Sequence, residues 1–135
     1  MATLTPTLTI TGTAADFGNA LTVSETVNLT VQAPMTGPST VVATATPSDT
    51  TIKAASTGIA YLYVKHSGTT DGSTSTARQV DVEFTTGEAI ARLSANEFLF
   101  MPVHHAEENV GVNLHVQHSS PSDVVQMEYA FYSKT

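Results

Sequence analysis

The stretch Gly58–His66, GIAYLYVKH, decides the fold of this chain, because no other run is so strongly strand-like. Leu62 and Val64 alternate with Tyr61 and Tyr63, so the two sets point to opposite faces of an extended chain. A run that is apolar on both faces, opened by glycine and closed by a polar loop, is typical of a strand inside a sheet. We expect Leu62 and Val64 to face the core. The two tyrosines should face a second layer or a neighbouring chain, because each hydroxyl needs a hydrogen-bond partner.

The Thr-rich N-terminal segment is the next clear pattern. In Thr3–Thr13 apolar residues, among them Leu8 and Ile10, alternate with threonines, which predicts a half-buried strand. Pro6 has no N–H to donate to a ladder. We therefore expect residues 1–12 to form an edge strand or an N-terminal arm, with firm pairing from Thr7 onward.

The other strand-like segments are short and are separated by turn residues. They cover residues 21–23, 27–33, 39–46, 51–53, 79–84, 89–93, 98–103, 110–118 and 124–132. Residues 79–84 alternate most sharply, with Val80 and Val82 expected inside and Asp81 and Glu83 outside. About ten short strands at this spacing predict an all-β fold, a two-sheet antiparallel β-sandwich of jelly-roll-like connectivity. One domain is expected over residues 1–135.

The loop at residues 67–75 contains only serine, glycine, threonine and aspartate. Such a composition predicts an exposed and mobile segment. Two interpretations remain open, a flexible connection and a loop that contacts a partner.

Composition excludes several classes of function. Charged residues make up 13% of the chain, against roughly 25% in ordinary soluble domains, and serine and threonine take their place. A net charge of -7 with five basic residues argues against nucleic acid or an anionic membrane as a partner. The absence of cysteine excludes disulfides and thiolate metal sites. We recognise no secretion signal or membrane span and expect a soluble protein.

The best candidate for metal or acid–base chemistry follows Pro102 and consists of His104, His105, Glu107 and Glu108. Adjacent histidines in an extended segment point to opposite sides, and His115 and His118 are separated by an odd step. An exposed polar loop is therefore the preferred interpretation, and we expect no metal, no cofactor and no catalytic residue. The chain also lacks a nucleophile elbow, a phosphate loop and the histidine pair of a cupin. We expect it not to be an enzyme.

Three segments carry a resemblance to a known group of proteins. They are YLYVKHSGTT at residues 61–70, IARLSANEFLFMPV at residues 90–103 and VVQMEYAFY at residues 124–132. They resemble small virion structural proteins of tailed bacteriophages, many from marine and cyanobacterial hosts. In that group a strand of the type LYVKN precedes a Ser/Thr-rich loop, a segment like GRLxAGEFxFxP follows, and an aromatic strand carrying Glu-Tyr closes the chain. The matching positions here are Arg92, Leu93, Glu97, Phe98, Phe100, Pro102, Glu128 and Tyr129. Asn96 stands where glycine is common, and asparagine can take that place if the turn requires a left-handed conformation.

The resemblance implies a non-enzymatic virion protein, foremost a capsid decoration or cement subunit that stabilises the shell. It also implies a homotrimer, made in the host cytoplasm and located on the capsid surface, with the major capsid protein or another virion protein as partner. A tail or head-tail component is one alternative. A carbohydrate-binding β-sandwich module for host recognition is another, since the aromatic FLF and YAFY segments could line a sugar-binding face. A small metal-dependent enzyme is the last.

The scarcity of charge also bears on association. Sheet edges are normally protected by lysine, proline or covering loops, and this chain has three lysines. Edges with so little protection are safer when a neighbouring chain covers them. We therefore expect an interface that includes Tyr61, Tyr63, Pro6 and Leu8.

Overall fold

The computed structural model describes residues 2–32, 36–45, 49–56, 61–84, 88–103, 110–117 and 122–133. Within these residues the chain forms twelve strands and one helical turn. The strands are β1 (Ala2–Leu4), β2 (Thr7–Gly12), β3 (Leu21–Thr26), β4 (Leu29–Val31), β5 (Thr36–Thr44), β6 (Thr50–Ser56), β7 (Tyr61–His66), β8 (Gln79–Phe84), β9 (Ala89–Leu93), β10 (Phe98–Pro102), β11 (Val110–Gln117) and β12 (Val124–Tyr132), and the turn is α1 (Ala14–Phe17). None of the helical residues among these forms a segment long and apolar enough to cross a membrane.

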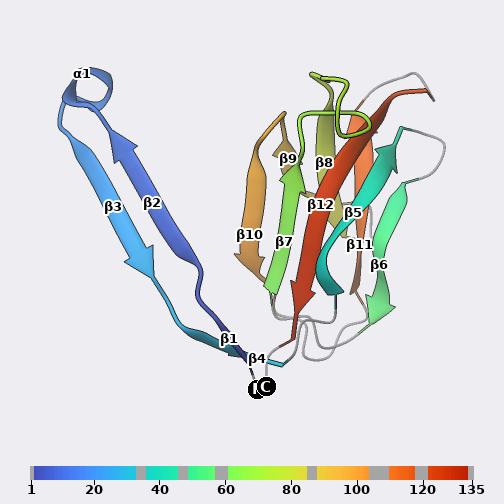
Figure 1. The fold of residues 1–135 in the computed structure, drawn as a ribbon, viewed down its shortest axis with the longest axis horizontal. Helices are drawn as coiled ribbons and strands as arrows, with labels where there is room; N and C mark the ends of the chain where they lie inside the picture. Colours follow the sequence, from blue (N-terminus) through green and yellow to red (C-terminus); the bar gives the residue numbers. More distant parts are fainter. Residues whose placement is uncertain are drawn as a thin grey trace.

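Eight of the strands form two antiparallel sheets that pack face to face (Figure 1). The first sheet has the order β10, β7, β12, β5, and the second has the order β6, β11, β8, β9. From β5 to β12 every connection crosses from one sheet to the other, except the one from β8 to β9, which stays in the second sheet. This order and connectivity are those of an eight-stranded jelly roll. The predicted all-β sandwich is therefore confirmed, and the strands beyond these eight belong to the N-terminal arm.

Strand β7 lies inside the first sheet, between β10 and β12. Leu62 and Val64 are 0% exposed and face the second sheet, as predicted. They join a core of side chains from the inner faces of both sheets, whose largest members include Phe131, Leu114 and Met127. The period-two pattern of each strand thus puts one set of side chains between the sheets.

The prediction that Asp81 lies outside is wrong in one respect. Its side chain leaves the outer face of β8, yet Asp81 is only 3% exposed. Arg92 covers it from β9, donating from Nε to Oδ1 at 2.6 Å and from Nη2 to Oδ2 at 3.0 Å, and Gln117 donates to the same carboxylate from β11. Side chains on neighbouring strands can bury a carboxylate on the outer face when an arginine binds it in a bidentate ion pair.

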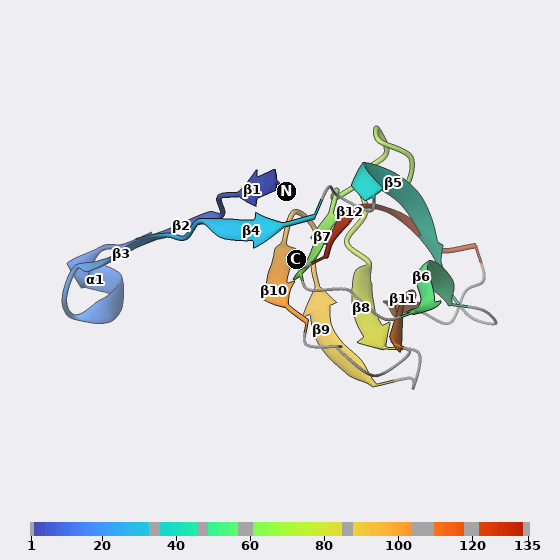
Figure 2. The same ribbon diagram turned by 90° about the horizontal axis from the view of Figure 1, so that it is seen from below.

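Residues 2–31 form an arm that extends away from the sandwich (Figures 1 and 2). β2 and β3 pair as a two-stranded ribbon with α1 at its tip, and β1 and β4 pair at its base. The prediction of a half-buried strand is wrong here, because Leu8 is 48% exposed and Ile10 is 43% exposed. The apolar and hydroxyl-bearing residues alternate here because they lie on opposite faces of the ribbon, and neither face packs into the core.

Candidate interaction site on the arm and the first sheet

The outer face of the first sheet is rich in aromatic side chains. Register pairs Phe100 of β10 with Tyr63 of β7, and Tyr132 of β12 with Tyr61 of β7. Because directly paired residues share a face, their rings gather on the side away from the core. The rings of Tyr61 and Phe100 stack, with centroids 5.9 Å apart and planes 4° apart. We call this surface, made by Tyr61, Tyr63, Phe98, Phe100 and Tyr132, the aromatic face.

Glu128 adds a carboxylate to the aromatic face. Burial of the Tyr63 hydroxyl raises its pKa, and so do the charge of Glu128 and the hydrogen bond that Tyr63 donates to it. The tyrosine therefore stays neutral, and its hydroxyl has the partner that the sequence required.

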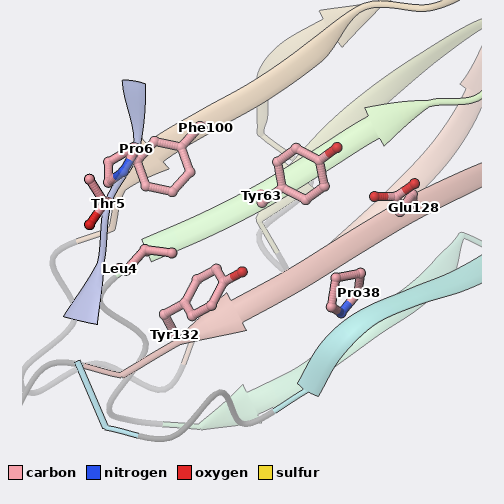
Figure 3. A pocket seen from close by; sticks show the side chains of 8 residues that line it. All are labelled: Leu4, Thr5, Pro6, Pro38, Tyr63, Phe100, Glu128 and Tyr132. Atoms are coloured by element: carbon pink, nitrogen blue, oxygen red, sulfur yellow. The ribbon is translucent and has the colours of Figure 1, made fainter. Parts of the chain in front are cut away.

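A cavity of about 320 Å³ opens where the base of the arm meets the aromatic face (Figure 3). Its lining residues are Leu4, Thr5, Pro6, Pro38, Tyr63, Phe100, Glu128 and Tyr132. The rings come from three neighbouring strands of the sheet and face the apolar side chains of Leu4 and Pro6 (Figure 3). The cavity is therefore mainly apolar, with one carboxylate in its wall.

A second groove, of about 510 Å³, lies between the arm and the edge strand β10. Pro6, Thr7 and Leu8 of the arm line it together with Phe98, Leu99 and Phe100 of β10 and Tyr63 of β7. Three of the predicted interface residues, Pro6, Leu8 and Tyr63, thus line one groove. The fourth, Tyr61, stacks on Phe100 beside it. Phe98, which is 60% exposed, also lines this groove but was not among the predicted interface residues; it was considered only as part of the FLF segment for a sugar-binding face.

The ribbon of the arm has two chemically different faces. Its register places Leu8 opposite Glu25, Ile10 opposite Val23 and Gly12 opposite Leu21. The alternate positions of the same pairing are all hydroxyl-bearing: Thr7, Thr9, Thr11, Thr22, Ser24 and Thr26. We call Leu8, Ile10, Leu21 and Val23 the apolar arm face. Three of these four side chains are exposed, although Leu8 also lines the groove beside β10, so most of this face is open to solvent.

His66 is a further residue that sequence reasoning missed. It is fully buried at the end of β7, on the same face as Leu62 and Val64. Nδ1 accepts a hydrogen bond from the Gly68 N–H at 2.9 Å, so Nε2 carries the proton and donates to the Arg78 carbonyl at 2.9 Å. The sequence contained one signal of this burial: His66 follows Val64 by two residues, so the two side chains point to the same face of the strand.

The predicted histidine and glutamate cluster, His104, His105, Glu107 and Glu108, lies outside the described residues, and so does His118. His115 is described, and its Nδ1 lies 2.7 Å from Oδ1 of Asp49. The described residues include no group of three or more potential ligands that could hold a metal ion.

Fold and site together define a jelly-roll sandwich with a projecting hairpin arm and an exposed aromatic face. Comparison of the chain with protein-family models, curated proteins and solved structures finds no match. The functional argument therefore depends on the geometry of these two surfaces and on the resemblance described above.

Proposed function

We propose that this protein is a non-enzymatic structural subunit whose function is association, and foremost a capsid decoration or cement subunit of a tailed bacteriophage. The observation that carries the proposal is the arm, whose apolar face lies in water in the single chain. A two-stranded ribbon is only marginally stable alone, and exposed apolar strands favour pairing with other chains. Such an arm gains stability when a partner covers it.

The sandwich supports the same function. Its aromatic face combines apolar area with few charges, and such surfaces are common in protein interfaces. The resemblance of residues 61–132 to phage virion proteins supplies the virion context. On this basis the partners are other copies of this chain, as a homotrimer, and the major capsid protein or another virion protein, at the capsid surface.

The proposal is tested by removing the arm while keeping its base. Leu4 and Leu29 are paired in the base, so an Asn-Gly turn can replace residues 5–28 and close a two-residue hairpin there. Shells that lack this protein are mixed with the full chain or the shortened chain, and bound protein is measured after sedimentation. We expect the full chain to bind and the shortened chain to lose binding. Thr70→Ala, in the loop after β7, is the control and should bind normally.

Tails and head-tail connectors purified from the same particle separate the capsid position from the alternative virion positions. A full chain that stays monomeric at every concentration and binds no part of the particle would refute the structural role altogether.

A specific observation favours carbohydrate binding as the second candidate. The cavity at the arm base presents the rings of Tyr63 and Tyr132 beside the Glu128 carboxylate. Sugar rings stack on aromatic faces, and carboxylates accept hydrogen bonds from sugar hydroxyls. Binding of the purified chain to host-surface glycans, lost in Tyr132→Ala, would support this candidate over the structural role.

A further inference from the structure

One cation in the described part of the sandwich, Lys65, forms no ion pair. Arg78 pairs with Asp123 at 3.3 Å and Arg92 pairs with Asp81 at 2.6 Å. Lys65, by contrast, forms no ion pair with any described residue. It lies between Phe98 of β10 and Glu128 of β12 on the outer side of β7, so its charge belongs to the aromatic face.

The apolar arm face contains the complementary charge. Glu25 is paired with Leu8 in the ribbon, so its exposed side chain leaves on the same side as Leu8, Ile10 and Val23. It too forms no ion pair with a described residue. The aromatic face also carries Glu128, which lies opposite Lys65 in the register and accepts the hydrogen bond of Tyr63. Lys65 and Glu25 are the charges of the two surfaces that have neither an ion pair nor a hydrogen bond among the described residues, and they have opposite sign.

We propose that the apolar arm face of one copy packs on the aromatic face of a second copy, with Glu25 of the arm paired to Lys65 of the neighbour. This inference depends on the proposed function, for which it specifies the contact between copies. Apolar area would supply most of the stabilisation, while the charge pair would fix the orientation of the arm.

The occupant is a second copy because the arm leaves its own sandwich. Both views show the ribbon pointing away from the two sheets (Figures 1 and 2). Of the arm, only Pro6 and the first two residues of β2, Thr7 and Leu8, line the groove against its own β10. Ile10 and Val23 lie further along the ribbon, where another molecule can reach them.

The arm has a break in its strands near the base, which suits a contact with a second copy. Both of its strands are interrupted at the same level, at Thr5–Pro6 on one side and at Val27–Asn28 on the other. One backbone hydrogen bond, from the Val27 N–H to the Pro6 carbonyl at 3.3 Å, and one side-chain bond, from Thr5 Oγ1 to Asn28 Oδ1 at 3.0 Å, cross the interruption. The angle of the arm can therefore adapt to a partner without breaking the β2–β3 ladder.

Charge reversal tests the pairing. Glu25→Lys and Lys65→Glu each place like charges together, so each should weaken self-association about tenfold in sedimentation velocity. Glu88→Lys reverses an exposed acid that belongs to neither surface and should leave association unchanged. Ile10→Thr should also weaken association, whereas Thr9→Ser, on the hydroxyl side of the same strand, should not.

Mixing the two charge variants distinguishes an arm that binds a second copy from an arm that folds back on its own sandwich. In an equimolar mixture, each substituted surface can meet its complement on the other variant, so association should recover. If the arm closed on its own chain, mixing would change nothing, and only the double variant Glu25→Lys/Lys65→Glu would recover.

The outcomes keep this inference apart from the proposed function. Unaltered association of both single variants, or no recovery on mixing, overturns the arm contact even if the chain still binds shells. Recovery on mixing by a chain that binds no part of the particle supports the arm contact and refutes the virion role. The circular dichroism of each variant should match the parent, because all of these positions lie outside the core.

Discussion

His66 shows how a polar side chain can occupy the core face of a central strand. Its two ring nitrogens bond to the Gly68 N–H and the Arg78 carbonyl, which belong to the two ends of the loop after β7. The side chain therefore joins both ends of that loop while it fills the edge of the core. A buried polar group is tolerated when each of its hydrogen-bonding atoms has a partner.

We expect His66→Leu to lower the free energy of unfolding by roughly 2 to 4 kcal/mol, because it leaves the Gly68 N–H and the Arg78 carbonyl without a partner. Urea unfolding followed by circular dichroism measures the difference. A loss no larger than that of an exposed substitution, about 0.5 kcal/mol, would mean that the ring does not hold the loop.

Asp71 organises the tip of the same loop. Its Oδ1 accepts hydrogen bonds from the Thr74 N–H at 2.7 Å and the Ser73 N–H at 2.9 Å, and the hydroxyls of both residues also donate to the carboxylate. The backbone bond from Thr74, followed by those from Ser73, lowers the pKa of Asp71 well below its usual range. The tip is exposed, as the sequence predicts, but it is densely hydrogen-bonded.

The lowered pKa predicts the pH dependence of this loop. A carboxylate whose pKa is depressed by folding stabilises the native state fully above its ordinary pKa of about 4, and loses that contribution as the pH falls toward the folded value. The difference in melting temperature between the parent and Asp71→Asn should therefore be constant from about pH 7 to pH 5 and shrink below about pH 4. A difference in melting temperature that grows as the pH falls would contradict a lowered pKa of Asp71.

At the scale of the element, β7 carries the stability of the first sheet. Leu62→Ala should lower the free energy of unfolding by about 2 to 5 kcal/mol, because the side chain is fully buried and its removal leaves a cavity. Thr70→Ala removes only a long hydrogen bond of 3.4 Å in an exposed loop and should change stability little. Equal effects of the two substitutions in chemical unfolding would contradict the placement of the core.

The strands of the sandwich could be predicted from the sequence because their side chains alternate between the core and the outer face. Asn96 has a φ of 70°, which is the left-handed conformation that asparagine can adopt in place of glycine at such a turn. The partner of an exposed strand could not be predicted, because alternation looks the same in a half-buried strand and in a ribbon with two open faces. Leu8 and Ile10 show this, because they alternate with threonines as in a half-buried strand and yet are exposed.

The candidate site was only partly predictable for a related reason. Tyr61 and Tyr63 could be assigned to the outer side of β7 from local spacing alone. Their neighbours Phe100 and Tyr132 come from strands distant in the sequence, and their register with β7 depends on the tertiary fold. The burial of Asp81 likewise depends on Arg92 and Gln117, which two other strands supply.

At the scale of the whole molecule, the balance of charge predicts how an assembly responds to salt. The proposed contact brings Glu25 of the apolar arm face to Lys65 of the aromatic face, beside Glu128, and the rest of that contact is apolar or hydroxyl-bearing. Exposed ion pairs are worth little and are screened by salt, whereas apolar burial is not. Raising sodium chloride from about 0.1 M to about 1 M, where the screening length falls from about 10 Å to about 3 Å, should weaken self-association only slightly.

Analytical ultracentrifugation at the two salt concentrations measures this response. Dissociation to monomers at high salt would show that charge, and not apolar area, holds the copies together.

The central position of β12 affects the order in which the molecule can be built. β12 follows every other strand of the sandwich in the chain, yet it lies between β7 and β5 in the first sheet. During synthesis the arm can close early, because its ribbon pairs residues close in sequence, while β5 and β7 wait for the strand that joins them. Non-local pairing of this kind is slow to form. A nascent chain therefore offers its arm before its own aromatic face is complete, so only a finished copy can receive the arm of another.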